Sequence, residues 1–148
     1  MLLETISQVF ERDLNKLHAE ISSYKNEQAL WLTDKQIANS AGNLCLHLNG
    51  NLNTYIGKFL GNTGYVRDRE AEFTLKHVPR TELLRKITET KEVVLTTLNS
   101  LNKIDLEKEF PERNFDNPVS VEFMLVHLAT HLTYHLGQIN YHRRLLDN

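Results

Sequence analysis

The chain has 148 residues, of which 41% are hydrophobic and 24% charged, with a formal net charge of -2 at neutral pH. This length suits one domain with a core of ordinary size, so residues 1–148 are expected to form a single domain. The chain has no basic excess to neutralise phosphates and no apolar run near the roughly 20 residues that cross a bilayer, so neither nucleic acid nor a membrane is an expected partner.

The N-terminal segment has the pattern of one amphipathic helix. Apolar residues recur at three- and four-residue steps from Leu3 to Tyr24, which predicts a helix over residues 2–27. The pattern begins without a basic region or cleavage site, so a cytoplasmic protein is expected. Residues 31–39 read as a connection to the next helix.

A second helix is predicted over residues 40–60. Ser40 is a suitable N-cap, and Gly61 is a suitable stop. Two glycines, Gly42 and Gly50, weaken this segment as an isolated helix, and they are expected to permit the close approach of a neighbouring one. Its inward face includes one histidine, His47.

The third predicted helix lies between two segments without a clear period. Residues 61–79 and 103–118 are expected to be long connections, of the kind that are often functional or span the length of a bundle. Thr81 is the expected cap of the third helix, which would end near Asn102.

The last predicted helix opens at Val119 or Ser120 and runs to about Leu146. With no strand signal anywhere, four helices of this length predict an all-α fold, a four-helix bundle. The two long connections permit neighbouring helices to run parallel rather than strictly up and down.

Three histidines with four-residue spacing, His127, His131 and His135, dominate the last helix. Residues four apart lie on the same side of a helix, and two imidazoles one turn apart can hold one ion. We expect His131 and His135 to join His47 of the second helix in a tripod that leaves a coordination position open. The alternative is that each ring is satisfied by a carbonyl group, water or a neighbouring side chain.

Other candidates for a role in the site are weaker. A pair formed by His127 and His131 competes with the pair above, but it would face away from the apolar stripe. His142 lies two turns beyond His135, too far for the same ion. The single cysteine, Cys45, is expected to be a buried, inert thiol.

Two stretches carry a resemblance to a known family: Leu-His-Leu-Asn-Gly-Asn-Leu at residues 46–52 and His-Leu-Thr-Tyr-His-Leu-Gly-Gln-Ile at residues 131–139. The chain resembles the DinB/YfiT-like superfamily of metal-dependent four-helix proteins, and the Arg-Asp-Arg-Glu run at residues 67–70 is similar to a loop of one branch. The resemblance implies an up-down-down-up bundle, frequently a homodimer. It also implies a divalent metal, zinc or nickel in most cases, on the trio His47, His131 and His135.

The same resemblance implies an activity. Characterised relatives include thiol transferases and a maleylpyruvate isomerase, so we expect a divalent-metal-dependent enzyme that transfers a low-molecular-weight thiol to an electrophilic small-molecule substrate. The family often has arginine directly after the last histidine, where this chain has Leu136, so the substrate class does not carry over. Three neutral imidazoles would also accept cobalt or copper.

Four polar residues are candidates for supporting roles. Asn51 and Gln138 lie one turn beyond His47 and His135 and could orient the rings, although polar residues at a bundle rim are the slightly better interpretation of each. Arg67 and Arg69 could bind a charged substrate, and the alternative is a self-neutralising, solvated loop or a dimer contact.

Two rival functions use the same histidines. Hydrolysis by metal-activated water would require a carboxylate base, and no acidic residue lies within one turn of a proposed ligand. The other rival is a non-catalytic, stress-associated homodimer in which the ion is a structural clasp or is absent.

Overall fold

A computed structural model describes residues 2–148, and this part of the chain is all-helical, as expected. It contains no β-strand, only an isolated bridge between Glu109 and Ser120. No helix in residues 2–148 has the length and apolar character needed to cross a membrane. The helical elements are, in chain order, α1 (Leu2–Ser22), the 3-10 helix η1 (Glu27–Trp31), α2 (Ala41–Leu52), the π-helix η2 (Asn53–Lys58), α3 (Phe59–Gly61), α4 (Arg69–Thr74), α5 (Arg80–Ser100), α6 (Lys103–Glu107) and α7 (Val121–Leu146).

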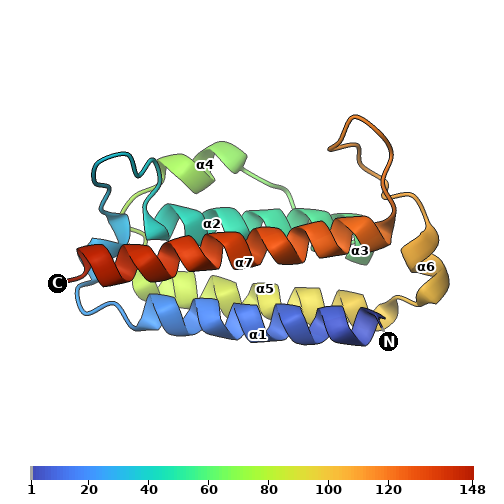
Figure 1. Cartoon of the computed structure of the whole chain (residues 1–148), viewed down its shortest axis with the longest axis horizontal. Coiled ribbons are helices and arrows are strands. Elements are labelled where there is room, and N and C mark those ends of the chain that lie inside the picture. The colour runs from blue at the N-terminus through green and yellow to red at the C-terminus, as the bar shows by residue number, and fades with distance from the viewer. Residues whose placement is uncertain (1) are drawn as a thin grey trace.

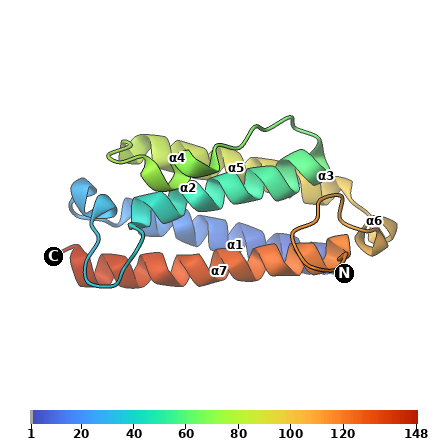
Figure 2. The ribbon, with the colours of Figure 1, turned by 90° about the horizontal axis from the view of Figure 1, so that it is seen from above.

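Four long helical rods lie side by side in an elongated molecule (Figure 1). The rods are α1, the continuous run of α2, η2 and α3, then α5 and α7. Figures 1 and 2 show that α1 and α7 run in one direction, whereas α2 and α5 run in the other. Helix α1 packs against α5 and α7, and α2 packs against the same two helices. The two short helices, α4 and α6, lie outside the rods.

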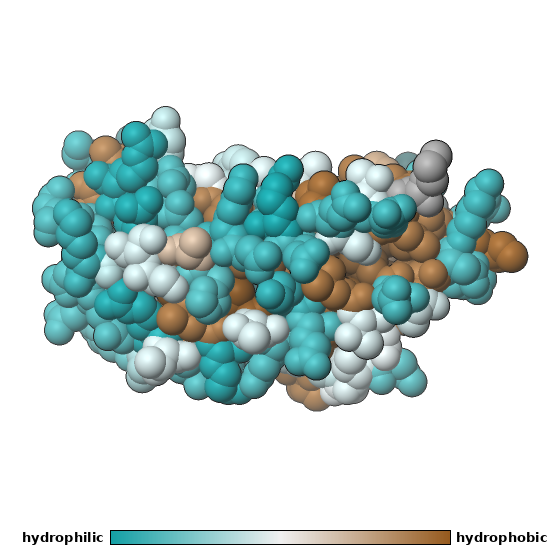
Figure 3. Space-filling model, turned by 90° about the horizontal axis from the view of Figure 1, so that it is seen from below, coloured by the Kyte–Doolittle hydropathy of each residue, from teal (hydrophilic) through white to brown (hydrophobic). Residues whose placement is uncertain are grey.

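The core forms where the apolar stripes of the rods meet. On α1, Phe10, Leu17 and Ile21 are fully buried, and Leu83 and Leu98 of α5 are buried to the same degree. Burying each such side chain contributes about 1.5–3 kcal/mol. The face in Figure 3 is mostly hydrophilic, with hydrophobic residues showing between polar side chains.

Helix α1 ends at Ser22, so the prediction of a helix to residue 27 was too long. The cause is a contact with the far end of the chain. The Asp147 carboxylate accepts hydrogen bonds from the backbone N–H groups of Lys25 and Asn26, at 2.6 and 3.0 Å. The Asn26 side chain then caps η1 by accepting from the N–H of Gln28. No local sequence pattern encodes that partner.

The second helix begins as predicted, because the Ser40 side chain caps α2 by accepting from the N–H of Asn43. Both glycines of this segment permit a close approach. A Cβ on Gly42 would lie 2.7 Å from the Trp31 ring, and one on Gly50 would lie 1.9 Å from a carboxylate oxygen of Glu72. The π-helical turn that follows Leu52 was not predicted.

The two connections contain short helices that the sequence pattern did not reveal. Helix α4 lies within residues 61–79, and α6 lies within residues 103–118. Both are too short for a period to show, and each depends on its cap: the Asp68 side chain accepts from the N–H of Ala71, and Asn102 forms a capping box. The prediction of Thr81 as a cap was wrong, because α5 begins at Arg80, after Pro79.

Cys45 is fully buried in α2, as predicted. Burial raises the pKa of its thiol to about 12. We therefore expect no reaction of the native protein with a thiol reagent such as dithionitrobenzoate at pH 8, and release of one equivalent of dye after unfolding in guanidinium. Rapid labelling of the native protein would contradict the buried position of this side chain.

Candidate metal centre

Three histidines from two neighbouring helices bring their ring nitrogens together. The Nε2 atom of His131 lies 3.3 Å from Nε2 of His47 and 3.2 Å from Nε2 of His135. The ligand atoms of the three residues all lie within 4.8 Å of one another, so the group could hold a metal ion. His47 is buried, and the other two side chains are half-buried.

The secondary structure explains how the group forms. His131 and His135 are one turn apart on α7, so their rings project from one side of that helix. His47 lies in the middle of α2, which packs against α7 in the opposite direction. The spacing within α7 was readable from the sequence, and the packing of α2 against α7 supplies the third ring.

A buried carboxylate that was not predicted supports the first ring. The Nδ1–H group of His47 donates to Oε1 of Glu72 at 3.0 Å, and Glu72 is 6% exposed. The sequence has no acidic residue within one turn of a proposed ligand, but α4 carries Glu72 across α2 to the His47 ring. The signal for this contact was Gly50, three residues after His47 and on the same side of α2, where a Cβ would meet the carboxylate.

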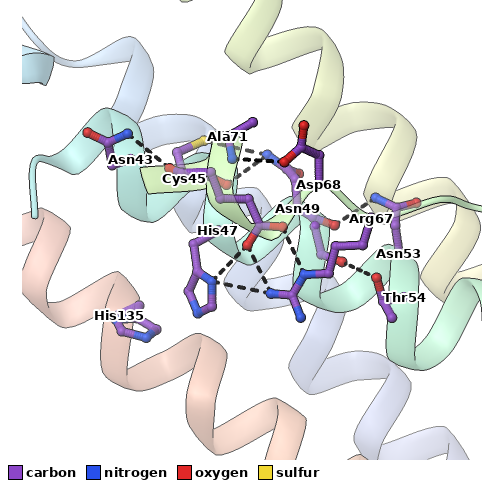
Figure 4. Close-up of polar contacts among 12 residues, drawn as sticks. Asn43, Cys45, His47, Asn49, Asn53, Thr54, Arg67, Asp68, Ala71 and His135 are labelled. Atoms are coloured by element: carbon purple, nitrogen blue, oxygen red, sulfur yellow. Dashed lines mark hydrogen bonds and ion pairs between the residues drawn. The ribbon is translucent and has the colours of Figure 1, made fainter. Parts of the chain in front are cut away.

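Arg67 completes this arrangement. Its guanidinium donates two hydrogen bonds to the Glu72 carboxylate, from Nε at 2.8 Å and from Nη2 at 2.9 Å. Figure 4 shows the Arg67 guanidinium beside His47, with a dashed line between them, and Nη2 of Arg67 lies 3.4 Å from Nδ1 of His47. Burial alone would raise the pKa of Glu72, but the hydrogen bonds from His47 and Arg67 outweigh it and lower that pKa. Glu72 is therefore ionised at neutral pH, and Arg67 neutralises its charge.

The rings of His135 and His131 differ in the hydrogen bonds that their Nδ1 atoms make. The Nδ1–H group of His135 donates to Oε1 of Gln138 at 2.7 Å, so Gln138 contacts the ring as the sequence suggested. The Nδ1 atom of His131 is buried without a hydrogen-bond partner, and so is Oδ1 of Asn51. Both residues line the same cavity. The Asn51 Oδ1 atom therefore accepts no hydrogen bond from a histidine ring in this structure.

The hydrogen bonds fix which nitrogens face the centre as lone pairs. His47 and His135 each give their Nδ1 hydrogen to a neighbour, so their Nε2 atoms carry no hydrogen when the rings are neutral. The neutral His131 ring has at most one hydrogen to share between the Nε2 lone pairs of His47 and His135. A cation, in contrast, would satisfy the Nε2 atoms of all three histidines. Tetrahedral zinc with Zn–N bonds of 2.0–2.1 Å separates its ligands by about 3.3–3.4 Å, and the two short spacings here are 3.2 and 3.3 Å.

The surroundings keep two of the rings neutral. Burial, together with the neighbouring rings of His135 and His47, lowers the pKa of His131 to about 4. Burial also lowers the pKa of His135, although the hydrogen bond with Gln138 opposes this shift. Imidazole binds a metal only in its neutral form, and both of these shifts favour that form.

A polar cavity of about 250 Å³ is lined by two of the three histidines, His47 and His131. In the described part of the chain its lining includes no carboxylate, and it includes both arginines that were predicted to bind a charged substrate. The lining residues are His47, Asn51, Tyr55, Arg67, Arg69, Asn114, Phe115, Met124, His127, Leu128 and His131. Larger cavities elsewhere on the surface do not reach the trio.

The remaining histidines stay outside the trio. His127 is exposed at the cavity, with its ring stacked 6.4 Å from that of His131, and it is not part of the group of converging nitrogens. His142 is buried elsewhere, with Nδ1 2.7 Å from the Tyr24 hydroxyl and Nε2 2.8 Å from the Leu32 carbonyl. The expected separation of His142 from the site is therefore confirmed.

Comparison with known proteins adds a family and a fold. A family described as "Protein of unknown function (DUF1572)" matches residues 2–148. The solved structure of a conserved protein from Enterococcus faecalis superimposes with a TM-score of 0.75 at 17% identity, covering 97% of this chain and 95% of that one, which shows a shared fold. No curated protein matches the chain. Because the match spans nearly every residue, the chain belongs to the DUF1572 family of proteins of unknown function.

Proposed function

We propose that this protein is a divalent-metal-dependent enzyme with His47, His131 and His135 as ligands of zinc or nickel. The proposal includes a single domain over residues 1–148 of the DinB/YfiT-like four-helix type. The opposed directions of the four rods, with α1 and α7 against α2 and α5, support that classification. The reaction that we propose is the transfer of a low-molecular-weight thiol to an electrophilic small molecule.

The observation that carries the proposal is the convergence of three Nε2 atoms beside a cavity. Three protein ligands leave room for an exchangeable one, as in catalytic rather than structural zinc sites. Glu72 and Gln138 hold two of the rings by their Nδ1 hydrogens, which is the usual support for metal-ligating histidine. We propose Asn51 as the corresponding partner of His131, because each has one buried polar atom without a partner.

The chemistry follows from the site. A divalent cation held there would stabilise a thiol as its thiolate at neutral pH. The thiolate sulfur attacks an electrophilic carbon in the cavity, a carbon–sulfur bond forms, and the leaving group departs with its electron pair. Hydrolysis is less well supported, because the carboxylate in contact with the His47 ring, that of Glu72, is also bound to Arg67 and does not line the cavity.

The activity can be tested with a generic electrophile. Protein loaded with zinc or nickel is expected to release chloride from chlorodinitrobenzene with a thiol at a rate at least about tenfold above the same thiol alone. A His47→Ala protein is expected to show only the uncatalysed rate. Equal rates for both proteins with several thiols would contradict the proposed enzyme and leave the clasp as the better reading.

The second candidate is a non-catalytic homodimer with the ion as a structural clasp, and a surface feature favours association. Helix α7 exposes five large apolar side chains within an arc of about 100°. The exposed side chains are Phe123, Val126, Tyr134, Tyr141 and Leu145. Tyr134 also borders an apolar groove of about 510 Å³ between α1 and α7. One surface thus offers both a protruding ring and a groove, which is what a twofold contact between two copies requires.

The association can be measured by sedimentation. We expect a dimer of the purified protein at micromolar concentration and a monomer for Tyr134→Glu, with helical content unchanged. A wild-type monomer at 100 μM would contradict the homodimer. Because the Tyr134 ring lies 5.4 Å from that of His135, the metal content of this variant is measured alongside its state of association.

A further inference from the structure

The strongest unassigned feature of the molecule is the charge of the cavity beside the three histidines. Its lining contains two arginines and no carboxylate in the described part of the chain. One of the two, Arg67, has its charge neutralised by the bidentate contact with Glu72. The other, Arg69, belongs to none of the ion pairs found in residues 2–148.

The position of Arg69 is set by aromatic packing. Its guanidinium lies over the Phe73 ring, 5.3 Å from the centroid, and Phe73 in turn packs against the His47 ring at 4.9 Å. Arg69 and Phe73 are both on α4, one turn apart. A cation stacked on a ring keeps its N–H groups free for an anion. The packing therefore keeps an unpaired positive charge on the lining of the cavity that the trio borders.

We propose that the cavity selects a small thiol that also carries a carboxylate, with Arg69 as the residue that binds the carboxylate. This inference rests on the proposed function, since it places the thiolate at the metal held by the trio. A thiolate and a carboxylate in one molecule match a divalent cation and one free guanidinium. A neutral thiol would leave Arg69 unpaired in the complex.

The size of the cavity limits the size of the thiol that it can hold. A volume of about 250 Å³ lies below the roughly 300–1,000 Å³ of cavities that enclose drug-sized ligands. A mercaptocarboxylate of the size of 3-mercaptopropionate fits into this space. A thiol tripeptide would extend beyond it, past Asn114 and Phe115 of the loop that borders the cavity.

The test compares two thiols that differ only in charge. Protein loaded with Co²⁺ is titrated with 3-mercaptopropionate and with 3-mercaptopropionamide, and the near-ultraviolet absorption of cobalt–thiolate bonds reports binding without any turnover. We expect 3-mercaptopropionate to bind at least about tenfold more tightly, with a preference that shrinks as salt rises.

Two arginine variants test whether Arg69 is the residue that causes the preference for 3-mercaptopropionate. Arg69→Gln is expected to bind both thiols with the affinity that the wild type has for the amide. Arg144→Gln is the matched control, because Arg144 also stacks on an aromatic ring at 5.3 Å, that of Tyr141, but does not line the cavity. This control is expected to keep the full preference.

Each failure has a distinct meaning. Absence of the cobalt spectrum itself would overturn the proposed metal site. A normal cobalt spectrum with equal affinity for both thiols, or with no thiolate absorption, would overturn the present inference and leave the metal site standing. A preference that survives in Arg69→Gln would overturn the role of Arg69.

Discussion

Replacement of His131 by alanine is expected to abolish metal binding, because this ring is in contact with both of the others. Its Nε2 lies 3.3 Å from that of His47 and 3.2 Å from that of His135. Loss of a residue that only supports a ligand weakens metal affinity by roughly 10- to 100-fold, so loss of the ligand itself should exceed about 100-fold. Elemental analysis of protein purified without chelator is expected to give one ion per wild-type chain and less than about a tenth in His131→Ala.

His127→Ala is the matched control for this experiment. His127 lies one turn before His131 on the same helix and lines the same cavity, but it is not in the converging group. The protein is expected to retain a full equivalent of metal, with a circular dichroism spectrum like that of the wild type. Stoichiometric metal in both His131→Ala and His47→Ala would exclude the proposed tripod.

The three histidines could be found from the sequence because a helix imposes its own geometry. A four-residue spacing on α7 places His131 and His135 together whatever surrounds them. His47 was found because its helix carried an inward histidine at mid-length. The same local rule identified Gln138, three residues after His135, as a partner of that ring.

Glu72 could not be found in this way, because its contact depends on how α4 crosses α2. Helix α4 has six residues, too few for a hydrophobic period, and it is held by side chains that read as an ordinary charged loop. Asn43, from α2, donates to the backbone carbonyls of Glu72 and Leu75 at 2.9 Å each and fixes this crossing. Such a contact spans about 30 residues of chain and leaves no periodic trace in the sequence.

Some helix ends could likewise be predicted from local sequence, whereas one could not. Ser40 was predicted as an N-cap, and Ser120 was one of two residues predicted to open the last helix; each accepts a hydrogen bond from an N–H group three residues later. The end of α1 was not predictable, because Asp147, more than 120 residues away, binds the backbone that follows it. Local chemistry therefore determines where most of these helices begin, and tertiary contacts determine where α1 ends and how α4 is placed.

Metal affinity is expected to depend on Gly50, a residue with no side chain, because the Glu72 carboxylate lies directly against it. A Cβ at this position would lie 1.9 Å from Oε2 and 2.6 Å from Cδ of Glu72. In Gly50→Ala the carboxylate must leave, so His47 loses its partner and Arg67 its counter-charge. We expect metal affinity to fall by roughly 10- to 100-fold and the free energy of unfolding by about 2–3 kcal/mol.

Two further variants separate this effect from a general cost of alanine in a helix. Glu72→Gln removes the charge without adding bulk, and it is expected to lower metal affinity by the same factor as Gly50→Ala. Gly137→Ala, at an exposed position of α7 where an added Cβ meets nothing within 4 Å, is expected to raise the free energy of unfolding by about 0.5–1 kcal/mol. Isothermal titration with zinc and urea unfolding of the metal-free proteins provide both quantities. The contrary result would be a Gly50→Ala protein that binds zinc as tightly as the wild type while Glu72→Gln binds it more weakly. The Glu72 carboxylate would then contact the His47 ring in spite of the added Cβ, and the proposed role of Gly50 would be disproved.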